Sequence, residues 1–408
     1  MYTKKIFTLV LYCLMLQGSY VLAAPIPGAQ VEELLEWAQQ ENPQLTASRF
    51  AAEAQLQRAD SADAWPDPTL RMEWMDVNAA SNTRYTVMQT VPFWGKRGLR
   101  RAVAEAEARQ ANGAMLETWA ELSARIKIDF AQYYLLHHSA KLIREILVLV
   151  DNLERIAQAR YATGLAAQQD VIRAQMEQTQ LQRDLVMLET EHHHVMTRLN
   201  TLLRREPAAP LAEPQHLRPV PPQLLSATGN AQWQLRKNNT QLQVVEAALQ
   251  AVEKNRELIF KNRYPDFTLG IAPVQAGGQI KEWGLMAEFS IPLQQTARRA
   301  NERAAEAELG EATARREALI SQLTGDLVKE ILSLQAAQRL ENIARSSLLP
   351  QAETTLQAAL TGYQTGKVDF ATLLDAQRQI FKARLDVLNA QTDAQTSLAK
   401  IEKLLGEK

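Results

Sequence analysis

The stretch Pro66-Asp67-Pro68-Thr69-Leu70 recurs as Pro265-Asp266-Phe267-Thr268-Leu269, about 200 residues further along the chain, which is far beyond the spacing of solenoid repeats. Four more matches keep the same order and nearly the same offset. They pair Asn42-Pro43-Gln44-Leu45 with Asn239-Thr240-Gln241-Leu242, Val91-Pro92 with Ile291-Pro292, Tyr161-Ala162-Thr163-Gly164 with Tyr363-Gln364-Thr365-Gly366, and Ala174-Gln175 with Ala376-Gln377. Chance does not supply five matches in register, so we predict an internal duplication.

The two copies are separated by a proline-rich linker. Prolines stand at positions 207, 210, 214, 219, 221 and 222, and proline cannot continue a helix. We therefore predict a first repeat over residues 24–206, a linker over 207–230 and a second repeat over 231–408.

The N-terminus reads as a secretory signal over residues 1–23. Lys4 and Lys5 precede an apolar run over 6–16, and small residues follow up to Ala23. This run is well short of the ~18–20 apolar residues that a membrane span needs. The only cysteine, Cys13, lies inside the signal after the bulky Tyr12, so lipidation is not expected and the mature chain has no disulfide or thiolate chemistry.

The composition favours long helices and argues against several functions. Aromatic residues make up only 6%, and Ala, Leu, Gln, Glu and Arg are abundant. The mature net charge of −3 offers no basic field for nucleic acid, which is not expected as a partner. No serine-hydrolase, P-loop or zinc-protease motif occurs, so we predict no enzyme, no catalytic residue and no cofactor.

Each repeat is predicted to follow one plan. A helix (43–64; 240–263) ends at a Pro-Asp pair, and two segments alternate with period two, which is typical of strands. The strands are predicted at 69–76 and 83–90, and at 267–274 and 283–290. A helix of roughly 100 Å follows (96–163; 294–365), ends at a left-handed glycine (Gly164; Gly366), and is succeeded by a return helix.

Four strands are too few to close a membrane barrel, because the smallest outer-membrane barrels need about eight. No later segment is a continuous apolar span, so a membrane crossing would have to use these strands. Several chains would then share one barrel. The alternative is a soluble coiled-coil protein carrying two small hairpins.

The duplication, the two strands per repeat, the proline linker and the paired Tyr-x-Thr-Gly tips resemble the outer-membrane factor family of TolC-like efflux and secretion channels. The resemblance implies a mainly α fold. Long antiparallel coiled-coil helices would form an α-barrel, and four transmembrane β-strands per chain would contribute to a shared 12-stranded β-barrel in a trimer. It also implies an outer-membrane location extending into the periplasm, contact with outer-membrane lipid, a periplasmic adaptor and an inner-membrane transporter.

The resemblance also implies where a gate would lie. The turns at Gly164 and Gly366 would be the periplasmic tips, and Asp170 and Asp375 match acidic residues of the family's narrow end. Thr372 stands where a further family acid would be. Asp369 is a candidate substitute, with Lys367 as a closing partner. Three copies of one aspartate around a pore would favour cations, although an aspartate at a helix start can instead be a simple cap, which we favour for Asp369.

A second candidate region is the bend from strand to helix. Trp94 suits an interfacial aromatic belt, and Lys96 and Arg97 would lie just beyond the lipid as an anchor. The Gly-Lys-Arg run at 95–97 resembles the heavy-metal branch of the family. The run His192-His193-His194 does not suit chelation, because neighbouring helical residues point ~100° apart, so we predict no metal site.

Together these features predict a trimeric outer-membrane channel of a tripartite efflux system, a passive exit duct with heavy-metal cations as the leading substrate. The alternatives are a channel for drug efflux or type I protein secretion, or, in another class, a periplasmic coiled-coil adaptor or structural protein. Adaptors have one helical hairpin flanked by β-rich domains, whereas two hairpins are predicted here.

Overall fold

The computed structural model describes residues 26–77, 80–222, 228–290 and 293–407, so the predicted signal peptide lies outside the described residues. The first repeat contains α2 (Val31–Glu41), α3 (Pro43–Ser61), β1 (Thr69–Val77), β2 (Ala80–Val91), α4 (Lys96–Ala162) and α5 (Gln168–Leu202). The second repeat contains α7 (Thr228–Asn238), α8 (Thr240–Lys261), β3 (Phe267–Ala276), β4 (Gln279–Phe289), α9 (Gln295–Ile343), a π-helical turn (Ala344–Leu348), α10 (Leu349–Gln364) and α11 (Phe370–Leu405). The order of elements therefore repeats along the chain.

The repeated asparagines explain why the helices of both repeats begin where they do. The Oδ1 atom of Asn42 accepts hydrogen bonds from the amides of Gln44 and Leu45, and Oδ1 of Asn239 accepts one from Leu242. Such N-caps satisfy amides that the helix itself leaves unpaired. The Nδ2 atoms donate to the Leu202 carbonyl at 2.8 Å and the Leu404 carbonyl at 2.9 Å. Each asparagine thereby ties the start of its repeat to the end of the same repeat.

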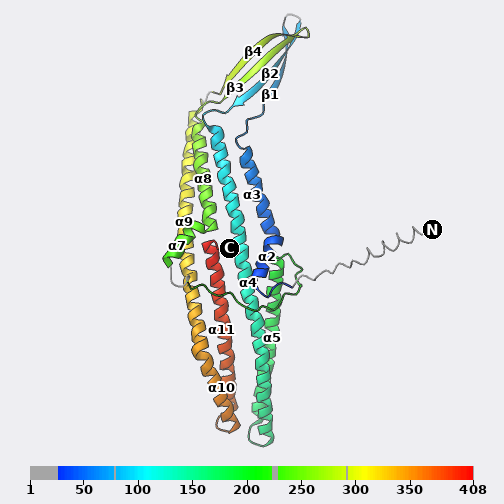
Figure 1. Cartoon of the computed structure of the whole chain (residues 1–408), viewed down its shortest axis with the longest axis vertical. Coiled ribbons are helices and arrows are strands. Elements are labelled where there is room, and N and C mark those ends of the chain that lie inside the picture. Colours follow the sequence, from blue (N-terminus) through cyan, green and yellow to red (C-terminus); the bar gives the residue numbers. More distant parts are fainter. Residues whose placement is uncertain (1–25, 78–79, 223–227, 291–292, 408) are drawn as a thin grey trace, which may run out of the picture.

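The strands form one antiparallel sheet in the order β1-β2-β3-β4 at one end of the molecule (Figure 1). Each strand overlaps one of the four predicted segments. The pairing of β2 with β3, for example Val91 opposite Phe267, joins the two repeats. Leu70, Trp74 and Leu285 are exposed at alternate positions, so apolar side chains cover a face of the sheet that no described residue buries.

The helices run along the long axis of the molecule, from the sheet to two hairpin tips at the opposite end (Figure 1). The helices next to the sheet form an upper row, in which α3 packs on α4, α4 on α8 and α8 on α9. The helices next to the tips form a lower row, in which α5 packs on α4, α4 on α11, and α11 on α9 and α10. The long helices α4 and α9 belong to both rows. None of the described helices has an apolar stretch long enough to cross a bilayer.

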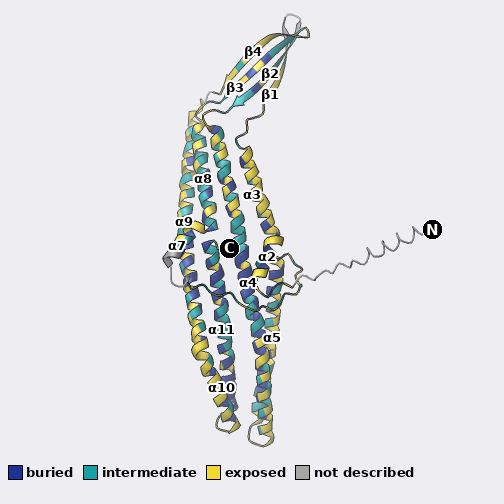
Figure 2. Ribbon diagram, viewed as in Figure 1, coloured by how far each residue is buried: buried dark blue, intermediate teal, exposed yellow. Residues whose placement is uncertain are grey.

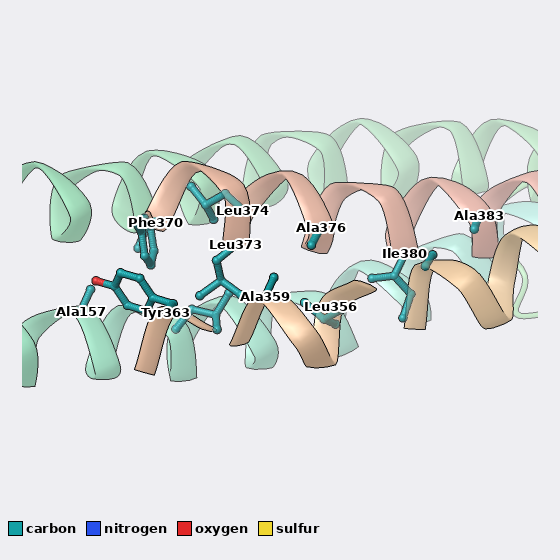
Figure 3. Close-up of a cluster of buried hydrophobic side chains, with 13 residues drawn as sticks. Ala157, Leu356, Ala359, Tyr363, Phe370, Leu373, Leu374, Ala376, Ile380 and Ala383 are labelled. Atoms are coloured by element: carbon teal, nitrogen blue, oxygen red, sulfur yellow. The ribbon is translucent and has the colours of Figure 1, made fainter. Parts of the chain in front are cut away.

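Buried residues lie where neighbouring helices pack on one another (Figure 2). Many are alanine or leucine, as expected where long helices pack closely over their whole length. One cluster lies beside the tips and joins α10 and α11 to the end of α4, with Leu373 and Phe370 almost fully buried (Figure 3). Exposed residues are frequent on α3, α9 and α10, which lie at the margins of the rows.

Three features of the fold differ from the sequence-based expectation. The helix predicted over 294–365 is interrupted by the π-helical turn at Ala344–Leu348, directly before Pro350. Proline has no amide hydrogen and its ring crowds the preceding turn, so a wider turn accommodates it without ending the helix. The short helices α2 and α7 were not predicted, and α7 begins inside the predicted linker.

Candidate functional site

The two hairpin tips are built in the same way. Gly164 and Gly366 both have φ +74°, the left-handed conformation that was predicted for them. The amide of Leu165 donates to the Arg160 carbonyl at 2.8 Å, and that of Lys367 donates to the Gly362 carbonyl at 2.8 Å. These bonds satisfy carbonyls at the helix ends and reverse the chain within a few residues. The two turns lie side by side at the end of the molecule away from the sheet (Figure 1).

Asp170 joins one tip to the other. It lies in the first turn of α5, and its Oδ2 accepts a 3.0 Å hydrogen bond from the Tyr363 hydroxyl of α10. Tyr363 is buried, and its ring lies against Phe370 and close to Ala157 of α4 (Figure 3). Burial and the hydrogen bond to Asp170 raise the pKa of Tyr363 to about 12, so the hydroxyl remains a donor throughout the physiological range.

Arg160, near the end of α4, makes a second connection between the tips. Its Nη1 donates to the Gln364 carbonyl of the second tip at 2.7 Å, and its Nη2 donates to Leu165 of its own tip at 3.2 Å. The guanidinium also lies 4.9 Å from the ring centre of Tyr363. One side chain thus contacts both turns and the tyrosine that bonds to Asp170.

About two turns above the tips, α5 and α11 are joined by an ion pair. The Arg378 guanidinium donates to Oε2 of Glu177 at 2.5 Å and 3.1 Å, and the Glu177 side chain is only 6% exposed. Asp375 lies 4.0 Å from Arg378, but its side chain is 70% exposed. Asp375 therefore keeps its charge at the surface of the helix pair rather than in the contact.

Asp369 is the N-cap of α11, as we favoured from the sequence. Its Oδ1 accepts hydrogen bonds from the amide and the hydroxyl of Thr372, at 2.9 Å and 2.6 Å. These bonds hold the pKa of Asp369 below its usual range. Lys367 is exposed and forms no ion pair with another described residue, so the predicted closing pair of Lys367 is not formed within one chain.

The strand–helix junction requires a correction to the predicted anchor. The Lys96 side chain is only 4% exposed, and its Nζ donates to Asp266 Oδ1 at 2.9 Å and to the Tyr264 carbonyl at 2.8 Å. An ammonium that is buried and bonded to two groups of the protein is not available to lipid head groups. Lys96 instead joins the start of α4 to the Pro-Asp pair of the second repeat.

The other two predicted anchor residues are more accessible. Trp94 is 42% exposed and stacks on Tyr264, with ring centres 4.9 Å apart. The Arg97 guanidinium lies 4.6 Å from the ring centre of Trp65, and its Nε donates to the Asp63 carbonyl at 2.7 Å. An interfacial role for Trp94 and Arg97 remains a proposal.

Sequence reasoning missed the residues that connect the hairpins, namely Arg160, Glu177, Tyr363 and Arg378. Tyr363 belongs to the repeated Tyr-x-Thr-Gly motif, but its counterpart Tyr161 is exposed, so the motif alone did not show which tyrosine is buried. No three histidine, aspartate or glutamate side chains of the described residues converge on a point that could hold a metal ion.

Comparison with known proteins adds three findings. A family model described as outer membrane efflux protein matches residues 233–407. The cobalt-zinc-cadmium resistance protein CzcC of Cupriavidus metallidurans is 23% identical over 359 residues, which cover 84% of this chain and 81% of that protein. The remaining likenesses are structural.

Two solved structures illustrate them. CusC, described as undergoing conformational changes on folding and transmembrane channel formation, has a TM-score of 0.81 at 17% identity, covering 94% of this chain and 93% of that one. VceC of Vibrio cholerae has a TM-score of 0.80 at 18% identity, covering 93% of this chain and 96% of that one. These likenesses confirm the predicted fold class.

Proposed function

We propose, from the premise that the chain belongs to the outer membrane efflux protein family, that three copies close into one exit duct for heavy-metal cations. The predicted family agrees with the family model that matches residues 233–407, and the outer-membrane location with extension into the periplasm and a role without catalysis follow from that membership. The trimer, the gate, the adaptor and transporter partners and the substrate are our proposals.

The trimer is supported by which strands and helices lie at the two outer edges of the chain. The outer strands are β1 and β4, the outer helices of the upper row are α3 and α9, and those of the lower row are α5 and α10. One margin is thus formed by the first repeat and the other by the second. The first-repeat margin of one copy would meet the second-repeat margin of the next. Such head-to-tail contacts close into a ring when the rotation from one copy to the next divides a full turn.

The exposed side chains at these margins fit the same arrangement. Phe50 of α3 and Met187 of α5 are exposed on the first-repeat margin, and Leu332 and Leu340 of α9 on the second. These apolar side chains would be buried when the margins of two copies meet. Three copies of four strands give twelve, which passes the roughly eight strands that a membrane barrel needs.

The gate is supported by the contacts at the tips. Three contacts join the first-repeat hairpin to the second-repeat hairpin of one chain: Asp170 with Tyr363, Glu177 with Arg378, and Arg160 with the Gln364 carbonyl. We propose that they hold the closed state, and that docking of an adaptor at the tips separates the hairpins. Energy for transport would come from an inner-membrane transporter.

Asp375 is the residue we propose for charge selection, because its carboxylate is exposed and threefold symmetry would repeat it around the pore. Asp375→Asn in the reconstituted channel should lower the preference for cations over anions by a few-fold. The measurement is the reversal potential in a salt gradient. Asp369→Asn is the matched control, since that carboxylate is engaged as a cap; equal selectivity in the Asp375 variant and the parent would exclude this role.

The observation that supports a metal substrate is the similarity to CzcC, which extends over most of both chains. The test is growth of a deletion strain on cobalt, zinc, cadmium, copper and silver salts, beside dyes, detergents and antibiotics. Sensitivity confined to metals and restored by the intact gene is the expected result. Sensitivity to organic compounds alone would reassign the channel to drug efflux, and a secretion defect without either would favour protein export.

A further inference from the structure

All six histidines of the chain lie on α4, α5 and the linker: His137 and His138 on α4, His192, His193 and His194 on α5, and His216 on the linker. We call this group the histidine belt. Figure 1 shows the linker running from the end of α5 across α4 and α11, about halfway along α4. Nothing in the proposed gate or sheet uses these residues.

Several contacts hold the linker in place away from the histidines: Asn200 and Arg205 donate to the carbonyls of Pro207 and Pro210, and Arg218 pairs with Glu402 of α11. At the level of the histidines its contacts to α4 are few. The Tyr133 hydroxyl donates to the Ala212 carbonyl at 3.2 Å, and Nε2 of His137 lies 3.8 Å from a carboxylate oxygen of Glu213. The amides of Ala212 and Gln215 donate to the carbonyls of residues 27 and 29, at 3.0 Å and 3.1 Å. The belt therefore lies where the linker closes on α4.

His138 is held in its neutral form. Its ring centre lies 4.1 Å from that of Tyr134, the ring donates a hydrogen bond to the backbone carbonyl of Pro214 in the linker, and its Nε2 is buried without a hydrogen-bond partner among the described residues. Burial first, and then His137 and Lys141, lower its pKa; the hydrogen bond to Pro214 and, more weakly, Glu213 act in the opposite direction. The remaining charged groups around the cavity that His138 lines are Glu145, Arg345 and Arg384.

His192 is in the same state on α5. Its ring lies 4.8 Å from the Tyr133 ring and 6.4 Å from the His137 ring, and its Nε2 is also buried without a partner. Burial first, and then His137, His193 and Arg144, lower its pKa, with Glu189 acting weakly in the other direction. A proton on either Nε2 would create a buried N–H without an acceptor among the described residues.

A metal ion does not account for this arrangement, because no three potential ligands of the described residues converge. We propose that the belt is a proton-sensitive clasp: neutral His138 and His192 allow the linker and α5 to close on α4, and their protonation in mildly acidic medium releases the linker. This property is independent of the proposed substrate.

The direction of the pH dependence follows from linkage. Burial depresses both folded-state pKa values below the unfolded value of about 6.5, so the open chain takes up protons first as the pH falls. The two neutral histidines therefore stabilise the closed linker fully above about pH 6.5. This stabilisation is lost as the pH falls through that value toward the folded-state pKa values. Each unit of depression corresponds to about a tenfold change in the opening equilibrium.

The experiment is amide hydrogen exchange of the purified full-length protein at about pH 7.5 and about pH 5.5, corrected for the chemical exchange rate. Exchange of the hydrogen-bonded linker amides of Ala212 and Gln215 should be about tenfold faster at the lower pH for each unit of pKa depression, with the amides of α9 unchanged. The double variant His138→Phe/His192→Phe should lose this acceleration. The matched control is His194→Phe, since the side chain of His194 is 65% exposed and pairs with Glu191; it should keep the acceleration.

Equal corrected exchange at both pH values in the parent, or an undiminished acceleration in the double variant, would overturn the proposal. If the double variant does not assemble, His138→Phe and His192→Phe are measured separately, and each should lose part of the acceleration. An acceleration that is undiminished in both single variants would also overturn the proposal. Zn²⁺ added at the higher pH is the final arm. Linker protection by Zn²⁺ in the parent but not in His192→Phe would show that the belt takes a metal rather than a proton.

Discussion

A channel that carries Tyr363→Phe together with Arg378→Gln should remain largely open where the parent is closed. The first change removes the hydroxyl that donates to Asp170, and the second removes the guanidinium that donates to Glu177. Both contacts join the first-repeat hairpin to the second, and neither change alters the turns at the tips. The closed arrangement therefore keeps only the bond from Arg160 to the Gln364 carbonyl, while the two hairpins keep their own packing.

The expected size of the effect comes from adding small contributions over three copies. A hydrogen bond to a charged group contributes about 1.5 kcal/mol at its lower range. The half-exposed Arg378 pair contributes about 0.5 kcal/mol after solvent screening. About 2 kcal/mol in each of three chains gives about 6 kcal/mol for a concerted gate, and about 5.5 kcal/mol already shifts a two-state equilibrium from 1:99 to 99:1.

Single-channel recording in planar bilayers measures this directly, as a rise in open probability and conductance. The matched control is Arg155→Gln, which breaks a 2.5 Å ion pair with Asp151 within α4 and so connects no hairpins. That variant should behave as the parent does. A double variant with the parent's conductance would exclude these contacts as the closing device, even if the channel itself is confirmed.

Much of the fold was predictable because it depends on local patterns. Period-two alternation located all four strands, and the positions of Gly164 and Gly366 gave the left-handed turns at which the long helices end. The π-helical turn before Pro350 was not predictable in this way. A proline inside a periodic helix can end it, kink it or widen one turn, and the packing of the neighbouring helices decides which occurs.

The site was predictable only in part, because its contacts join positions about 200 residues apart in the two repeats. Asp170 was identified, but its partner Tyr363 lies in the other repeat, and helical periodicity does not indicate which side chains meet across a pair of hairpins. Lys96 was assigned to the lipid interface because a cation beside an aromatic residue is typical there. The pairing of Val91 with Phe267 shows why this was wrong, since it brings the start of α4 to Asp266.

The corrected position of Lys96 leads to the second large effect, in which Lys96→Met destabilises the protein. The substitution removes the ammonium that donates to Asp266 and to the Tyr264 carbonyl, and it leaves that carboxylate without its partner. Breaking a fully buried pair costs about 3–5 kcal/mol; because Asp266 is about one-third exposed, we expect about 2–3 kcal/mol. In a chain of this size that lowers Tm by about 3 °C.

Two comparisons separate the internal ion pair from an interfacial anchor. Adding Asp266→Leu to Lys96→Met should restore part of the lost Tm, since an apolar pair removes the unpaired charge, whereas an anchor would gain nothing from the second change. The matched control Arg100→Met removes an exposed cation one turn further along α4 and should change stability by no more than about 0.5 kcal/mol. The Tm of Lys96→Met and of the parent, measured by circular dichroism in vesicles with and without anionic lipid, also distinguishes the two roles. An internal pair predicts the same loss in both, and a loss that appears only with anionic lipid would return Lys96 to the membrane interface.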